Sequence, residues 1–91
     1  MFYAISYDIP DDRRRLKIAK TLKDFGERVH LSVFEARLEN DQLKRMKERV
    51  KKILEPEEDS VRIYPLCASC SEKIEIIGAG KVSQDPDVIV I

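Results

Sequence analysis

The sequence has few of the features that mark export, crosslinking or membrane insertion. Among its 91 residues there are only two cysteines, and no apolar run approaches the roughly 18 residues of a membrane span. Its first residues also lack the basic, apolar and small-residue order of a signal peptide, so we expect a cytoplasmic protein with no membrane partner. Cysteines in that compartment normally stay reduced, which argues against a disulfide scaffold.

A net charge of either sign is missing too, because 17 basic side chains balance 17 acidic ones. A zero balance alone argues against a nucleic-acid partner, but the charges are distributed unevenly. Residues 1–54 carry 14 Lys and Arg against 9 Asp and Glu, whereas residues 55–91 carry 3 against 8. The basic first part could therefore bind a polyanion such as RNA or DNA while the acidic part repels it.

The spacing of apolar residues predicts a small α+β domain. Alternation indicates strands at residues 1–7, 29–38, 60–66 and 73–77. A longer apolar repeat predicts one helix from Asp11 to a left-handed stop at Gly26 and another from Asn40 or Asp41 to Pro56. The economical arrangement of residues 1–91 is a single ferredoxin-like β-α-β-β-α-β sandwich, with an antiparallel sheet, two helices on one face and an extra C-terminal strand.

The C-terminal strand, residues 88–91, is apolar and would leave an unpaired sheet edge at the chain terminus. A partner subunit could pair with it. A domain of this length also buries only a modest share of its surface alone. Both features predict a homodimer, in which residues near the twofold axis lie close to their own copies.

Asp8 is the acid best placed for chemistry. Alternation gives the first strand two different faces. The apolar face is made by Tyr3, Ile5 and Tyr7, and the small polar face by Ala4, Ser6 and Asp8. If the small face meets its twin across a dimer axis, two Asp8 carboxylates supply the oxygen ligands that Mg²⁺ or Mn²⁺ prefers. The simpler alternative is that Asp8 only helps to start the following helix.

Six cations follow within eleven residues: Arg13, Arg14, Arg15, Lys17, Lys20 and Lys23. They fit either contacts to phosphates or an ordinary solvated helix face.

The segment at residues 29–38 adds a second set of candidates. If Val29, Leu31 and Val33 fill the helix side, the face of Asp8 also carries Arg28, His30, Ser32 and Phe34. We then expect Arg28 to hold a phosphate, Ser32 to donate a hydrogen bond, and Phe34 to stack or to pack at the dimer contact. His30 suits general acid or base chemistry, although a single histidine is more often a strand filler.

The remaining motifs are weak signals. Cys67-Ala-Ser-Cys70 is a lone CxxC with too few ligands for structural zinc unless two chains share the ion. Its expected place between two strands is unlike a redox pair at a helix start, so two buried thiols are predicted. GAGK at residues 78–81 lacks the spacing of a phosphate loop, and the aromatic signature of the RNA-recognition motif is absent.

Three segments together resemble the CRISPR-associated Cas2 family, the small partner of the spacer-integrating enzyme. YDIPDDRRRLKIAKTLKDFG is similar to the opening strand, acid and basic helix of that family. ERVHLSVFEARL resembles its second-strand signature, with His30 where the family commonly has glutamine, and DSVRIYPLC resembles its third strand. The likeness covers nearly the whole chain.

The resemblance implies a homodimer of ferredoxin-like subunits whose Asp8 pair binds a divalent metal. One implied function is a metal-dependent endonuclease that cuts single-stranded RNA or duplex DNA. The other is a non-catalytic bridge that holds DNA between subunits of the CRISPR integrase. In the first, Asp8 and Tyr7 belong to the catalytic site, and the backbone is held by Arg15, Arg28, Ser32 and Phe34. The density of cations, independently of the resemblance, adds Arg13, Arg14 and Lys17 as nucleic-acid contacts. An RNA-cutting toxin of similar fold is a third alternative, which growth arrest on expression would reveal.

Overall fold

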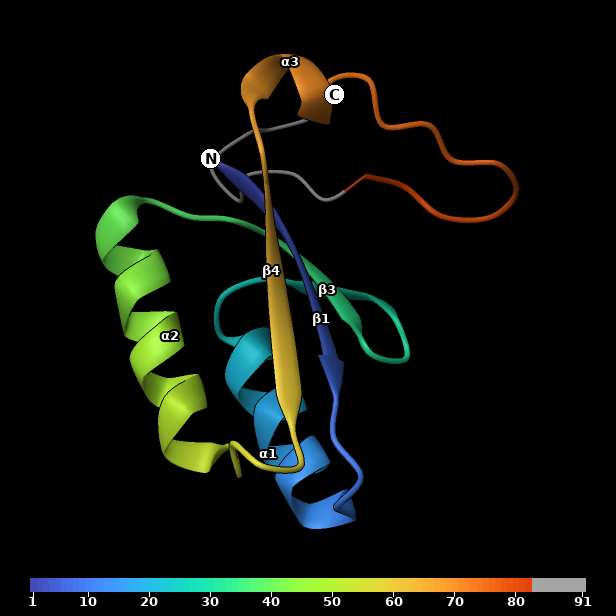
Figure 1. The fold of residues 1–91 in the computed structure, drawn as a ribbon. Helices are drawn as coiled ribbons and strands as arrows, with labels where there is room; N and C mark the ends of the chain where they lie inside the picture. The colour runs from blue at the N-terminus through green and yellow to red at the C-terminus, as the bar shows by residue number, and fades with distance from the viewer. Residues whose placement is uncertain (83–91) are drawn as a thin grey trace.

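Within residues 1–82, four strands form one antiparallel sheet in the order β2-β3-β1-β4 (Figure 1). The computed structural model describes residues 1–82, so the expected strand at residues 88–91 lies outside the described part. The elements are β1 Phe2–Asp8, α1 Asp12–Lys23, β2 Glu27–His30, β3 Val33–Arg37, α2 Asn40–Ile53, β4 Ser60–Leu66 and a short α3 Ala68–Ser71. Their order confirms the predicted ferredoxin-like β-α-β-β-α-β sandwich.

The core lies between one face of the sheet and the two long helices, which both cover that face (Figure 1). The buried side chains come from every layer: Tyr3, Ile5 and Tyr7 from β1, Phe34 and Ala36 from β3, Ile18, Ala19 and Leu22 from α1, and Met46 and Val50 from α2. The predicted apolar face of β1 is therefore confirmed. The opposite face of the sheet is not covered by either long helix.

The segment expected as one strand at residues 29–38 is instead a hairpin. β2 and β3 pair antiparallel across a turn at Leu31 and Ser32, with a register shift between Arg28 and His30. The hairpin supplies two neighbouring strands of the fold, and the strand expected at residues 73–77 is absent from the described residues.

The hairpin also reverses the predicted faces of this segment. Phe34 pairs with Ile5 and is fully buried on the helix side, whereas Val33 pairs with Ser6 on the uncovered face. The expectation that Phe34 shares a face with Asp8 was therefore wrong. The large ring fills the space under the helices better than a valine does, and the turn frees β3 from the alternation of residues 29–32.

Gly26 has a different role from the one expected. Helix α1 stops at Lys23, its capping residue Asp24 has a right-handed φ of −70°, and Gly26 is not among the glycines with positive φ. A Cβ at Gly26 would meet the carbonyl oxygen of Glu35 and lie 2.7 Å from the Cβ of Ala36. Glycine is needed here because the chain passes very close to β3.

Candidate functional site

Asp8 is the last residue of β1, on the face of the sheet that α1 and α2 do not cover. It pairs in register with Ser60 of β4, and Ala4 and Ser6 precede it on the same face. Its side chain is exposed and makes no hydrogen bond or ion pair with any residue between 1 and 82. A carboxylate in this state is available to a cation.

Arg15 holds the loop that follows Asp8. Its Nη1 donates a hydrogen bond to the carbonyl oxygen of Ile9 at 3.0 Å, and its Nη2 pairs with the carboxylate of Asp12. These contacts tie the first turn of α1 to the chain leaving β1. Arg15 therefore positions the loop beside Asp8. Both of its Nη atoms already contact groups of this chain.

Arg14 joins the start of α1 to the start of β4. Its Nε donates to Oδ2 of Asp59 at 2.7 Å, and its Nη2 pairs with Glu58 at 2.8 Å. The hydrogen bond from Arg14 lowers the pKa of Asp59 although burial opposes it, so both groups are charged at neutral pH. Because Asp59 directly precedes Ser60, this pair fixes the strand beside Asp8.

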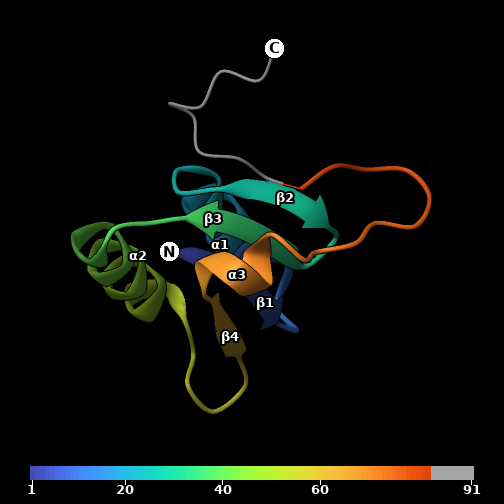
Figure 2. The same cartoon turned by 90° about the horizontal axis from the view of Figure 1, so that it is seen from above.

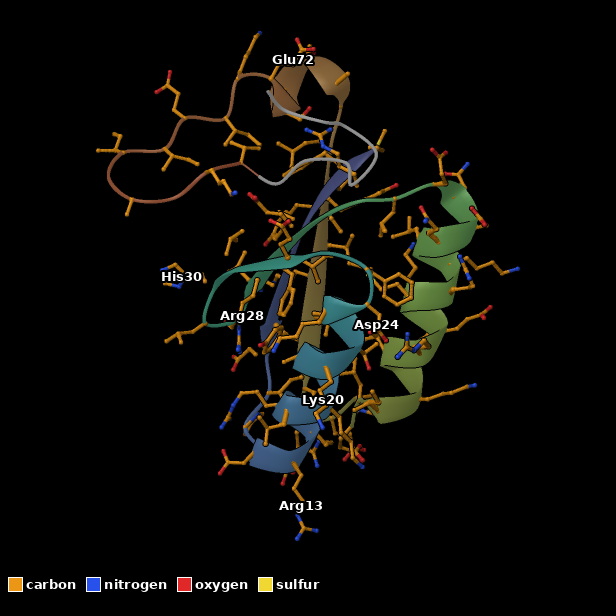
Figure 3. All side chains as sticks on the ribbon, turned by 180° about the vertical axis from the view of Figure 1, so that it is seen from behind. Arg13, Lys20, Asp24, Arg28, His30 and Glu72 are labelled. Atoms are coloured by element: carbon orange, nitrogen blue, oxygen red, sulfur yellow. The ribbon has the colours of Figure 1, made fainter. Side chains whose placement is uncertain are left out.

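Four other cations of α1 face solvent without a partner in the described part of the chain: Arg13, Lys17, Lys20 and Lys23. Arg13, Lys17 and Lys20 follow the helical spacing i, i+4, i+7 and therefore share one side of α1. Figure 3 shows Arg13 extending away from the first turn and Lys20 further along the helix. Of the four predicted phosphate contacts on α1, Arg13 and Lys17 are free, whereas Arg14 and Arg15 are engaged.

Tyr7 and Arg28 meet on the helix side of the sheet, so the expectation that Arg28 shares a face with Asp8 was wrong. The Tyr7 hydroxyl donates to the carbonyl oxygen of Leu31 at 3.1 Å and accepts from Nη2 of Arg28 at 3.1 Å. Arg28 also donates to Leu31 at 2.8 Å, and its guanidinium lies 5.8 Å from the ring centroid of Phe34. Together these contacts hold the β2–β3 turn against β1.

The remaining predicted residues of the hairpin lie at its turn. The backbone carbonyl of Ser32 accepts a hydrogen bond from the N–H of Tyr7 at 3.1 Å. His30 is exposed at the end of β2, at the outer edge of the molecule (Figure 3). The roles that the sequence suggested for Ser32, Arg28 and Tyr7 stay predictions.

Arg62 and Tyr64 of β4 belong to the same face as Asp8 and were not among the sequence candidates. Arg62 pairs with Ser6 and Tyr64 with Ala4, and Nη1 of Arg62 lies 3.5 Å from the Tyr64 hydroxyl. Alternation within residues 60–66 carries the signal that finds them, because Val61 and Ile63 pack against the core and turn their neighbours outward.

Neither a metal cluster nor a membrane helix is formed by one chain within residues 1–82. No three His, Cys, Asp or Glu side chains gather there into a group that could hold a metal ion. None of the helices in this part has the length and apolar character that crossing a bilayer requires.

Comparison with known sequences gives a consistent result. The family model described as CRISPR associated protein Cas2 matches residues 1–74. The CRISPR-associated endoribonuclease Cas2 1 of Chloroflexus aurantiacus is 52% identical over 98% of this chain and 100% of the relative. The CRISPR-associated endonuclease Cas2 2 of Thermus thermophilus is 42% identical over 98% of this chain and 94% of its own length.

Solved structures agree in fold. A hypothetical protein from Thermus thermophilus has a TM-score of 0.80 at 42% identity, covering 91% of this chain and 96% of its own. Streptococcus pyogenes Cas2 has a TM-score of 0.76 at 29% identity, covering 86% of this chain and all of its own. With the family match over most of its length, the chain belongs to the CRISPR-associated Cas2 family.

Proposed function

We propose that this chain acts as a homodimer that hydrolyses nucleic-acid phosphodiester bonds with a divalent metal bound by its two Asp8 carboxylates. One observation carries the proposal: Asp8 is an exposed carboxylate without a partner in residues 1–82, at the end of a central strand. The names of relatives add support, because they describe endoribonucleases and an endonuclease.

A dimer is proposed because one chain offers one carboxylate at this position. The face of the sheet that carries Asp8 is left uncovered by α1 and α2, and Ala4 and Ser6 are small enough to allow close approach of a second sheet. A twofold axis near the end of β1 would bring the two Asp8 side chains together. A pair of carboxylates with waters and a phosphate oxygen suits Mg²⁺ or Mn²⁺.

The bound metal would supply a hydroxide nucleophile and stabilise charge on the phosphate. The chain's own residues then have separate tasks. Asp8 holds the ion, and Arg15 and Arg14 fix the two segments beside it. Arg13 and Lys17 have free charges that can hold phosphates of RNA or DNA as it approaches along α1.

A second function has its own support. A chain similar to this one occurs in a solved structure of a partial Cas6-RT-Cas1–Cas2 complex. Its TM-score is 0.78 at 26% identity, and the match covers 99% of this chain and 98% of the other. By analogy, the dimer would bridge subunits of the CRISPR integrase and hold DNA during spacer acquisition, without cleaving it. This alternative depends on the exposed cations of α1 for DNA binding and gives Asp8 no role in catalysis.

Asp8→Asn separates the two functions. We expect it to lower divalent-dependent cleavage by more than about 100-fold on matched RNA and duplex DNA substrates, while Tm, dimerisation and DNA binding stay unchanged. Asp41→Asn, at an exposed acid on α2, is the matched control and should cleave normally. Cleavage that survives unchanged in rigorously purified Asp8→Asn would reject the hydrolytic proposal and favour bridging.

A further inference from the structure

The CxxC motif is the chemical feature that the proposed function leaves unused. β4 ends at Leu66, Cys67 directly follows it, and Cys70 lies within the four residues of α3. Both cysteines are free and exposed. The expectation of buried thiols between two strands was therefore wrong, because the chain after β4 turns into a helix instead of a strand.

The two thiols differ in pKa because they make different hydrogen bonds with each other and with Ser69. Sγ of Cys67 lies 3.2 Å from Oγ of Ser69. This contact, together with the backbone N–H and the thiol of Cys70, lowers the pKa of Cys67 to about 7. The hydrogen bond with Cys67 in turn raises the pKa of Cys70. Cys67 is thus the better attacking thiol near neutral pH.

We propose that Cys67 and Cys70 form a thiol–disulfide exchange pair that closes reversibly to an intrachain disulfide, with a low-molecular-weight disulfide such as oxidised glutathione as oxidant. The Cys67 thiolate attacks one sulfur of the oxidant, whose S–S bond breaks and releases one glutathione thiolate. The Cys70 thiol then loses its proton and attacks Cys67, releasing the second glutathione thiolate. Two electrons pass from the protein dithiol to the oxidant, and the two protons pass to the released thiolates.

A disulfide between Cys67 and Cys70 is better suited to reversible formation than to stabilising the fold. A disulfide between residues three apart closes a very short loop, so it constrains the unfolded chain little. Stabilisation of the Cys67 thiolate favours the reduced form and makes the disulfide easy to reduce.

The site is separate from Asp8. Leu66 pairs with Phe2 at one end of β1, whereas Ser60 pairs with Asp8 at the other, about 20 Å away along a seven-residue strand. Figure 2 shows α3 beside the start of β1, and Figure 1 shows it at the end of the sheet away from the first turn of α1. Thiol chemistry at Cys67 should therefore leave cleavage at Asp8 unaffected.

The test equilibrates the full chain in buffers of reduced and oxidised glutathione and follows free thiols by alkylation and mass spectrometry. We expect one two-electron transition to an intrachain disulfide, reversed by reduced glutathione. Single substitutions assign the order of attack. Cys70→Ser, which keeps Cys67, should form the glutathione mixed disulfide at pH 7 about fivefold faster than Cys67→Ser, which keeps Cys70. Adding Ser69→Ala to Cys70→Ser should slow that reaction.

Several results would overturn the proposal. These are thiols that stay reduced at every glutathione ratio, disulfides that form only between chains, and equal rates for the two single variants. Purified chain that retains stoichiometric zinc and whose thiols resist alkylation until a chelator is added would also overturn it, in favour of a metal site shared between copies. Each readout is independent of nuclease activity, so a failure here is distinguishable from a failure of the Asp8 proposal.

Discussion

Arg14 and Asp59 form an ion pair that crosses 45 positions of sequence and joins α1 to the strand beside Asp8. The Arg14 guanidinium donates from Nε at 2.7 Å and from Nη2 at 3.2 Å, and the Asp59 side chain is fully buried. Asp59 also accepts the backbone N–H of Glu55 at 3.0 Å. Part of the basic cluster that the sequence offers for nucleic acid is therefore used to build the fold.

Asp59→Asn should destabilise the protein in a way that depends on pH. Arg14 lowers the pKa of Asp59 in the folded chain, so the stabilisation is fully present above the unfolded value of about 4 and is lost as pH falls through the folded value. We expect a Tm about 10 °C below wild type at pH 7. The difference should shrink as the pH is lowered below about 4.

Thermal unfolding of both proteins between pH 7 and pH 2 measures this effect. Asp41→Asn is the control, because Asp41 is exposed and lies 4.0 Å from Arg45, so its Tm should stay within about 2 °C of wild type. A difference for Asp59→Asn that is constant across this pH range would show that the carboxylate charge is not the source of its effect.

The sequence predicted those features that follow from local periodicity. The faces of β1, the apolar stripe of α2 and the bounds of β4 came from alternation and helical spacing within single segments. The errors arose where contacts between distant segments determined the local structure. The bulge and turn between Arg28 and Val33 change which residues of this segment face the helices. As a result, Phe34 lies on the helix side.

Charge gave a similarly mixed result. Spacing alone did not separate Arg13, which faces solvent, from Arg14, which finds Asp59 far along the chain. The position of Asp8 on the small polar face of β1 was predictable, because only one strand had to be read. Whether the Asp8 of a second subunit lies opposite this Asp8 depends on how two chains pack together. The periodicity of one sequence does not predict that packing.

Gly26→Ala should destabilise the fold strongly through steric overlap. The added Cβ would collide with the Glu35 carbonyl oxygen and with Ala36, both parts of β3. We expect a loss of about 2 kcal/mol or more, measured by urea unfolding. Gly78→Ala is the comparison, because Gly78 has a φ of 101° but no atom lies within 4 Å of the methyl group that alanine would add. Only a conformational cost of about 1 kcal/mol is expected there. Equal losses at the two positions would contradict the close-approach explanation.

Tyr7→Phe tests whether the Tyr7 hydroxyl acts on the hairpin or on the reaction. Its hydrogen bond to Leu31 is lost, although Arg28 still donates to the same carbonyl. We expect a loss of about 1 kcal/mol and faster hydrogen exchange in the β2–β3 turn, with the pH profile of cleavage unchanged. A fall in cleavage well beyond about tenfold, in variant protein that is still folded, would assign the hydroxyl a direct part in the reaction.

The free cations of α1 should set the salt dependence of nucleic-acid binding. Arg13, Lys17 and Lys20 face solvent on one side of the helix, so replacing all three by Gln removes charge without breaking an ion pair of residues 1–82. If each contacts a phosphate, the slope of log K against log salt on duplex DNA becomes shallower by about 2 to 3 units, and affinity falls similarly for all sequences. The double variant Lys73→Gln, Lys81→Gln removes exposed charge beyond β4 and should keep the wild-type slope. An unaltered slope in the triple variant would exclude this side of α1 from the binding surface.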